Sequence, residues 1–178
     1  MNDIFPLLKP ADWEHRDLVV HDRFGFGEDA LVVAYARDGD GNFEIITQGS
    51  PEAGDPEGLR RLAFGNLARQ RYPFEVAEAG GLPFATASGH DFAAEKVLDP
   101  ATVLEAQRLL GTDSIQIAVP RRTCLMAFPQ DLTADQVQTM IKLVMYTYLD
   151  DSYGNAPITP SLFLFDQGEL VGFGRIGG

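Results

Sequence analysis

The stretch that decides the fold is residues 114–151, SIQIAVPRRTCLMAFPQDLTADQVQTMIKLVMYTYLDD. It begins with two short apolar runs, residues 114–120 and 123–129, which flank Arg121 and Arg122. Each run is too short to be a helix and is bounded by proline, as strands commonly are. We therefore expect a β-hairpin with the two arginines at its turn.

A long helix follows this hairpin, over residues 134–149. Thr133 and Gln136 have the spacing of a capping box, in which two amide groups at the helix start are satisfied reciprocally. Apolar residues then recur at helical spacing, which predicts one broad buried face. These residues are Val137, Met140, Ile141, Val144, Met145, Tyr148 and Leu149.

The rest of the chain repeats the order of helix and hairpin. An Asp-Pro pair begins an expected helix at residue 55 and again at residue 99, because aspartate caps a helix and proline fits its first turn. Gly80-Gly81 and the turn at 166–169 predict two more hairpins. The sequence thus predicts an α+β fold in a single domain, residues 1–178. Its antiparallel β-hairpins alternate with three main helices, which pack on one face of the sheet.

Charge is distributed unevenly along the 178 residues. The net charge is −12, from 26 acidic and 14 basic residues, and residues 1–58 alone hold 13 acidic and 4 basic ones. Such a field repels nucleic acid and anionic lipid and attracts basic proteins. We therefore expect a basic protein partner, and neither nucleic acid nor a membrane, although solubility alone also favours an acidic surface.

The cellular location is expected to be cytoplasmic. The single cysteine, Cys124, cannot form an internal disulfide, and its apolar strand is typical of a buried, inert thiol. The first residues lack the pattern of a secretory signal, and no apolar run approaches the ~20 residues of a spanning helix.

No motif in the sequence predicts catalysis, a metal site or a cofactor. The loop from Asp38 to Asn42 places oxygen ligands as a calcium loop does, but Phe43 and Gly49 stand where an EF-hand needs glycine and glutamate. A hairpin turn with an acidic tip is the better interpretation.

Arg121 and Arg122 are the candidates for binding an anion. Two guanidinium groups on a rigid turn can hold a carboxylate or phosphate through paired hydrogen bonds. A solvated turn, or an internal salt bridge to one of the many carboxylates, explains the same pair.

Three segments between residues 89 and 172 carry a family resemblance. They are Asp91-Phe-Ala-Ala-Glu95, Ile117-Ala-Val-Pro-Arg-Arg-Thr-Cys-Leu-Met-Ala127 and Pro157-Ile-Thr-Pro-Ser-Leu-Phe-Leu-Phe165. Their order resembles the bacterial YtpQ-type family, a domain of unknown function. The resemblance covers under half of the chain; it implies a bacterial cytoplasmic protein and supplies no activity.

The leading hypothesis is a non-enzymatic binding protein that occludes a basic partner, as an immunity protein inhibits a toxin. Steered association at the acidic surface would drive this binding. The residues expected to bind the partner are Asp38, Asp40, Glu44, Glu52, Asp55 and Glu57.

Two alternatives belong to other classes. An acidic secretion chaperone would be a homodimer that holds an effector segment, whereas the inhibitor is compatible with a monomer. A small enzyme acting on an anionic substrate would need four side chains to converge in one pocket. Those four are Arg121, Arg122, Asp150 and Asp151.

Overall fold

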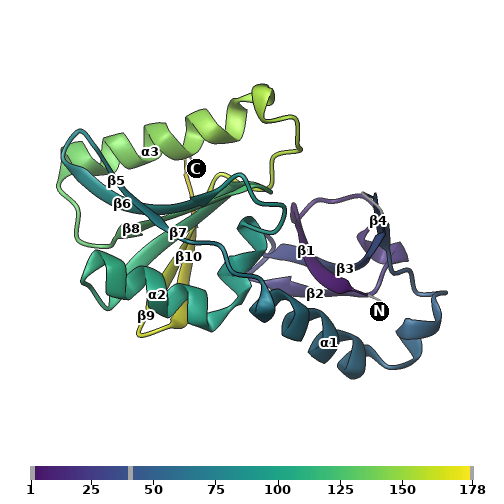
Figure 1. Ribbon diagram of the computed structural model, residues 1–178. Coiled ribbons are helices and arrows are strands. Elements are labelled where there is room, and N and C mark those ends of the chain that lie inside the picture. Colours follow the sequence, from purple (N-terminus) through teal and green to yellow (C-terminus); the bar gives the residue numbers. More distant parts are fainter. Residues whose placement is uncertain (1–2, 40–41, 177–178) are drawn as a thin grey trace. The chain divides into compact units, whose positions relative to one another are not determined.

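The computed structural model describes residues 3–39 and 42–176. Over these residues the chain forms three α-helices and ten strands, and the pairings between strands are antiparallel, which confirms the α+β class. Contacts divide the chain into two compact units, which we call unit 1 (Met1–Arg71) and unit 2 (Tyr72–Gly178). Each unit has its own sheet (Figure 1). The expectation of one domain over 1–178 stays a prediction.

Unit 1 is a small sheet with one α-helix. In the sheet, β1 and β2 flank β3, and the C-terminal half of β3 also pairs with β4. Its elements are β1 (Ile4–Lys9), β2 (His21–Phe24), β3 (Leu31–Gly39), β4 (Asn42–Ile45), α1 (Pro56–Arg69) and the 3-10 turns η1 (Arg16–Leu18) and η2 (Pro51–Gly54).

Strand β1 is an element that the sequence did not predict. Its residues include Pro6, which has no backbone N–H to donate to a neighbouring strand. A central strand uses the N–H groups on both of its sides, so proline disfavours that position. Among the strands that the structure describes, β1 pairs only with β3 and is an edge strand, where Pro6 lies opposite Tyr35. A proline is tolerated there because one side of the strand makes no ladder hydrogen bonds.

Helix α1 closes the core of unit 1 as the Asp-Pro device predicts. The Asp55 carboxylate accepts a hydrogen bond from the Gly58 amide over 2.9 Å and caps the helix. The buried face of α1 packs against β1 and β3 in a cluster of apolar side chains. This cluster contains Ile4, Tyr35, Ile46, Leu59 and Ala63.

Unit 2 is a six-stranded antiparallel sheet with a helix on each face. The strand order is β10-β9-β7-β8-β6-β5. Its elements are β5 (Glu75–Ala79), β6 (Leu82–Ser88), η3 (Ala94–Leu98), α2 (Pro100–Leu110), β7 (Ser114–Arg121), β8 (Cys124–Pro129), α3 (Ala134–Leu149), η4 (Asp151–Tyr153), β9 (Ser161–Asp166) and β10 (Glu169–Arg175).

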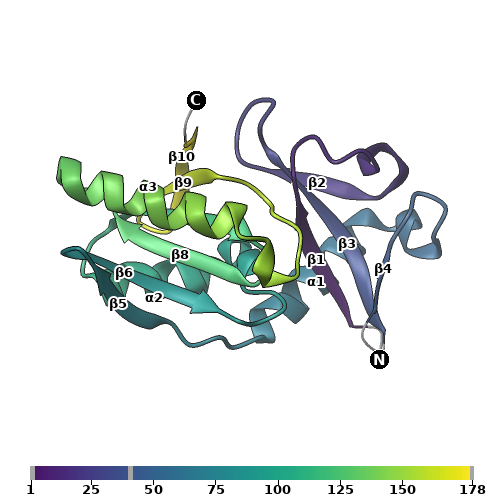
Figure 2. The same cartoon turned by 90° about the horizontal axis from the view of Figure 1, so that it is seen from above.

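Two crossover connections explain why the helices lie on opposite faces. The chain passes from β6 through α2 to β7, and from β8 through α3 to β9, each time stepping over one strand in the same direction. Because β6 and β8 are antiparallel, two crossovers of the usual right-handed sense place their helices on opposite faces. Figures 1 and 2 show α2 and α3 on either side of the sheet, which corrects the expectation of a single covered face.

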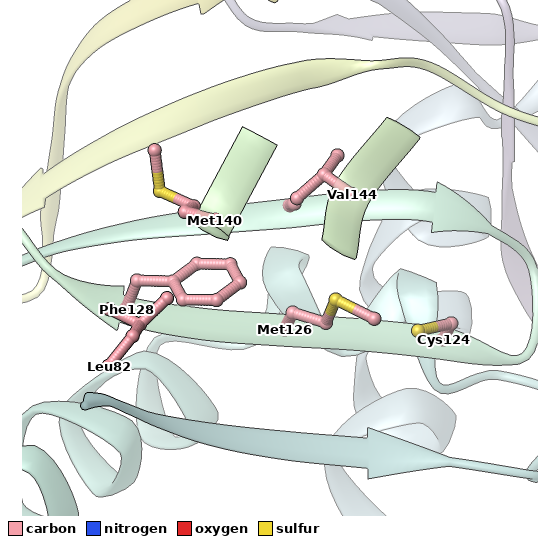
Figure 3. Packing of buried hydrophobic residues seen from close by; sticks show 7 residues of the cluster. Leu82, Cys124, Met126, Phe128, Met140 and Val144 are labelled. Atoms are coloured by element: carbon pink, nitrogen blue, oxygen red, sulfur yellow. The ribbon is translucent and has the colours of Figure 1, made fainter. Parts of the chain in front are cut away.

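The apolar runs of β7 and β8 follow from this double covering. Alternate residues of β8 point to α3: Cys124, Met126 and Phe128 form a buried cluster with Met140 and Val144 (Figure 3). The intervening residues of β8 are buried as well, because the other face carries η3 and α2. A strand buried on both faces has no polar alternation.

The ends of α3 are the best predicted boundaries in the protein. Thr133 and Gln136 form both hydrogen bonds of the capping box, and the helix runs from Ala134 to Leu149 as expected. The expected hairpins at Gly80-Gly81 and at 166–169 are also present. Before α2, residues Ala94–Leu98 form the 3-10 turn η3.

Candidate functional site

The predicted partner-binding residues all belong to unit 1. Asp38 is exposed near the end of β3, and Asp40 lies outside the described residues. Glu44 is on β4 and Glu52 is in η2. Asp55 and Glu57, which are also exposed, lie at the start of α1.

Arg37 ties two of these carboxylates to the body of unit 1. Its Nη2 donates to Glu52 Oε2 over 2.6 Å and its Nε donates to Glu52 Oε1 over 3.0 Å. Its Nη1 lies 2.9 Å from Glu44 Oε2. The paired hydrogen bonds from Arg37 lower the pKa of Glu52. Glu44 and Glu52 therefore share one cation and carry less unbalanced charge than the sequence suggests.

The outward charge comes from the remaining carboxylates and from Glu44, whose side chain is 75 % exposed despite its ion pair. Asp38 and Glu57 are exposed, and so is Asp55, although it also caps α1. Acidic residues at a helix start interact favourably with the helix dipole, so Asp55 and Glu57 stabilise α1 as well as adding negative charge.

The four basic residues of the first 58 make contacts inside unit 1. Lys9 lies over the ring of Trp13, 5.4 Å from its centroid. Arg16 and Arg23 donate to backbone carbonyl oxygens over 3.0 Å and 2.6 Å. Arg37 holds the two glutamates described above. Cations are thus held at the surface by local contacts, whereas many of the acidic side chains extend into solvent.

A polar network in the same unit was not predicted from the sequence. Asp22 on β2 accepts a hydrogen bond from the hydroxyl of Tyr35 on β3. The same carboxylate accepts from Arg60 on α1, at Nε over 2.8 Å and also at Nη2. The three residues lie on β2, β3 and α1, so their hydrogen bonds hold the helix against the sheet of unit 1.

The charges of this network determine its titration. The hydrogen bond from Arg60 lowers the pKa of Asp22, and the bond from Tyr35 adds to this effect against the opposing effect of burial. Burial, followed by the hydrogen bond to Asp22, raises the pKa of Tyr35. The hydrogen bond to Asp22 likewise raises the pKa of Arg60. At neutral pH the network therefore consists of a carboxylate, a guanidinium and a neutral phenol.

The network forms one side of a pocket of about 480 Å3. Its wall combines the three residues with the His21 imidazole of β2 and with apolar and amide side chains from the segments before β2, after β4 and at the start of α1. The lining residues are Val19, Val20, His21, Asp22, Tyr35, Gln48, Ala53, Pro56 and Arg60. Ala53 and Pro56 are neighbours in sequence of Glu52, Asp55 and Glu57.

Arg121, one of the two candidates for anion binding, is buried in unit 2. Only 1 % of it is exposed. Its Nε donates to the carbonyl oxygen of Thr147 over 2.8 Å, and its Nη2 donates to that of Tyr148 over 2.9 Å. Its Nη1 donates to the carbonyl oxygen of Asn155. The guanidinium thus faces the end of α3, which favours the internal role over an external anion.

Arg122 points to a different place. Its Nε donates to the carbonyl oxygen of Asp91 over 3.1 Å, and its guanidinium lies over the ring of Phe92. The two arginines therefore do not form a joint cradle for one anion. Anion binding at Arg121 and Arg122 stays a prediction, and the geometry favours separate structural contacts.

The four residues of the enzyme hypothesis meet only in part. Arg121 Nη2 lies 3.2 Å from Asp151 Oδ1, whose side chain is almost fully exposed. Asp150 ends α3, and hydrogen bonds from Ser152 lower its pKa. The hairpin turn and the end of α3 therefore come together, but they do so by burying Arg121.

Neither a metal-binding cluster nor a membrane-spanning helix occurs in the part of the chain that the structure describes. Among residues 3–39 and 42–176, no group of three or more His, Cys, Asp or Glu side chains is placed to hold a metal ion. No helix in this part of the chain is both long and apolar enough to cross a membrane.

Comparisons with protein-family models, curated proteins and solved structures found no match to this chain. The resemblance to the YtpQ-type family therefore stays a prediction.

Proposed function

We propose that the protein is a non-enzymatic binding protein whose acidic unit 1 occludes a basic protein partner, such as a bacterial toxin in the cytoplasm. The observation that carries this proposal is the difference between basic and acidic side chains in unit 1. Its first four cations are engaged in local contacts, while Asp38, Asp55 and Glu57 are exposed. Over residues 1–71 there are 13 acidic and 8 basic side chains, so unit 1 carries a net charge of −5.

The mechanism begins with electrostatic steering. Exposed carboxylates raise the rate at which a basic protein arrives in the correct orientation, and they do so without a deep pocket. Occlusion follows when the partner's basic functional surface is covered. Glu44 and Glu52 contribute less to steering, since Arg37 neutralises part of their charge.

Capture from the native host's lysate at low and at high salt tests the proposal. Because added salt screens charges beyond about 10 Å at 0.1 M, a steered partner is retained at low salt and released at high salt. Mass spectrometry identifies the released protein, and light scattering on the remainder distinguishes a monomer from a homodimer. The identified protein is then purified and mixed with the chain to measure binding and inhibition directly.

The design separates the proposal from non-specific adhesion. The double variant Asp38→Lys/Glu57→Lys reverses two exposed charges of unit 1, and Glu75→Lys/Glu78→Lys reverses two exposed charges on β5. Loss of binding and inhibition only in the first variant supports the proposal. Equal loss in both variants, or a partner that is retained at all salt concentrations by both, contradicts it.

A further inference from the structure

The pocket beside Asp22 has the dimensions of a small-molecule site. Its volume of about 480 Å3 falls within the range of roughly 300–1,000 Å3 that is common for ligand pockets. A few polar groups and several apolar side chains share its lining, which is also typical of such sites. The acidic surface proposed for partner binding does not explain this composition.

The polar groups of the pocket are already arranged before a ligand arrives. Asp22 accepts hydrogen bonds from Arg60 Nε and Nη2 and from the Tyr35 hydroxyl. Tyr35 is 1 % exposed, so its ring is fixed by the core of unit 1. The carboxylate thus fixes the plane and direction of the Arg60 guanidinium.

This arrangement favours an anion over a cation. The charge of Asp22 is balanced by Arg60, and its oxygens already accept three hydrogen bonds, so little attraction remains for a second cation. The Arg60 side chain is half exposed, and Asp22 engages only its Nε and Nη2. Because Arg60 lines the pocket and these two bonds use one side of its guanidinium, the N–H groups of Nη1 are the donors it offers to an incoming carboxylate.

The apolar lining specifies the rest of the ligand. Val19, Val20, Ala53 and Pro56 present aliphatic surface around the polar end of the pocket. A ligand that consists of one anionic group and a short hydrocarbon body satisfies both parts of the lining. Burial of each methylene contributes about 0.8 kcal/mol, so a hydrocarbon body adds to the affinity of the anionic group.

From this geometry we infer that the pocket of unit 1 binds a small organic carboxylate with an apolar body. Arg60 contacts the carboxylate, and Asp22 and Tyr35 are positioning residues. The inference does not rest on the proposed partner binding, although the pocket lies in the same unit, and a titration without any protein partner tests it.

The experiment is a two-dimensional NMR titration of the full chain with hexanoate, with inorganic phosphate and with the neutral alcohol hexanol. Hexanoate is expected to bind saturably and to shift the amides of residues 19–22, 48 and 53–60. Phosphate tests the anionic group alone, and hexanol tests the hydrocarbon alone. Both are expected to bind at least about tenfold more weakly than hexanoate.

Three variants assign the binding to Arg60. Arg60→Ala is expected to weaken hexanoate binding about tenfold or more, whereas Arg61→Ala, at the next and also exposed position, is expected to change it by less than about twofold. Arg60→Lys keeps the charge without the forked geometry and is expected to bind with intermediate affinity. The amide spectrum of Arg60→Ala shows whether that variant is folded. If it is not, Arg60→Lys provides the comparison with wild type.

The opposite results overturn the inference. These are the absence of saturable hexanoate binding, equal binding of hexanol, binding of phosphate as tight as that of hexanoate, or equal affinity in wild type and the Arg60 variants. Tyr35→Phe provides a separate readout, because it removes one hydrogen bond to Asp22 and leaves Arg60 in place. It is expected to weaken binding less than Arg60→Ala does.

Discussion

Arg121 Nε donates a hydrogen bond to the carbonyl oxygen of Thr147 over 2.8 Å, and this bond joins the end of β7 to the last turn of α3. The last carbonyl groups of any α-helix lack partners within the helix. In this protein the buried guanidinium supplies partners for two of them, at Thr147 and Tyr148. The apex of the central hairpin therefore closes the C-terminal end of the longest helix.

The first prediction concerns this closure. Arg121→Met is expected to lower the free energy of unfolding by about 3 kcal/mol or more, because one buried and two partly buried carbonyl groups lose their donor together. Asp151→Asn is expected to cost less than about 1 kcal/mol, since the carboxylate that pairs with Arg121 is almost fully exposed. Urea unfolding of both variants checks these values, with the exposed Arg108→Met as the control.

The relative size of the two effects is the informative result. If Asp151→Asn costs as much as Arg121→Met, the ion pair rather than the helix end is what Arg121 stabilises, and the interpretation above is wrong.

The second prediction is a pH dependence at Asp22. The hydrogen bonds from Arg60 and Tyr35 lower its pKa in the folded state below the 3.8 of an unperturbed aspartate. A carboxyl group of this kind stabilises the fold above its unfolded pKa and loses that contribution as the pH falls toward the folded pKa. The difference in unfolding free energy between wild type and Asp22→Asn should therefore be constant above about pH 5 and shrink as the pH falls below 3.8.

Urea unfolding between pH 7 and pH 3 measures this difference. Asp12→Asn removes one exposed carboxylate of the same unit and is the matched control, whose unfolding free energy is compared with that of wild type over the same pH range. A wild-type advantage over Asp22→Asn that persists undiminished at the lowest pH is incompatible with a lowered pKa at Asp22.

The third prediction concerns the tight turn between β9 and β10. Gly168 has a φ of +84°, and a Cβ atom there would lie 2.9 Å from Leu104 Cδ2. Gly168→Ala is expected to cost about 1–2 kcal/mol, because the left-handed backbone is strained for alanine and Leu104 must move. Gly174→Ala meets no atom within 4 Å and is expected to be neutral within about 0.5 kcal/mol. Thermal unfolding of the pair compares them, and equal costs would refute the turn argument.

Local signals in the sequence were sufficient where a few adjacent residues decide the structure. The capping box of Thr133 and Gln136 defined the start of α3. Its predicted apolar stripe was correct in part: Met140 and Val144 are buried against the sheet, whereas Leu149 is 66 % exposed. Gly80 and Gly81 both have positive φ, as a two-residue hairpin turn requires. The pairing of β5 with β6 was therefore predictable from these two residues.

Long-range relationships were not predictable in this way. The Asp22 carboxylate and the Arg60 side chain are 38 positions apart, and nothing in the local pattern relates the register of β2 to the face of α1. Arg121 was misleading for a different reason. Two adjacent arginines at a hairpin turn are typical of a solvated tip, whereas the partners that bury Arg121 are backbone carbonyl groups, which every residue possesses.

The candidate site was predictable in its charge but not in its details. Composition alone located the acidity in the first 58 residues. It did not show that Arg37 holds Glu44 and Glu52, which leaves Asp38, Asp55 and Glu57, together with the still exposed Glu44, as the exposed carboxylates among the predicted residues that the structure describes. Such pairings depend on which strands and turns become neighbours.

The association rate constant with the captured basic protein tests the central claim most directly, measured by stopped flow at increasing salt for wild type, Asp38→Lys/Glu57→Lys and Glu75→Lys/Glu78→Lys. For wild type, the rate is expected to fall steeply with salt. The unit 1 variant is expected to associate about tenfold or more slowly at low salt, and the β5 variant within about threefold of wild type. A rate that is independent of salt and equal in all three proteins would contradict an acidic docking surface on unit 1.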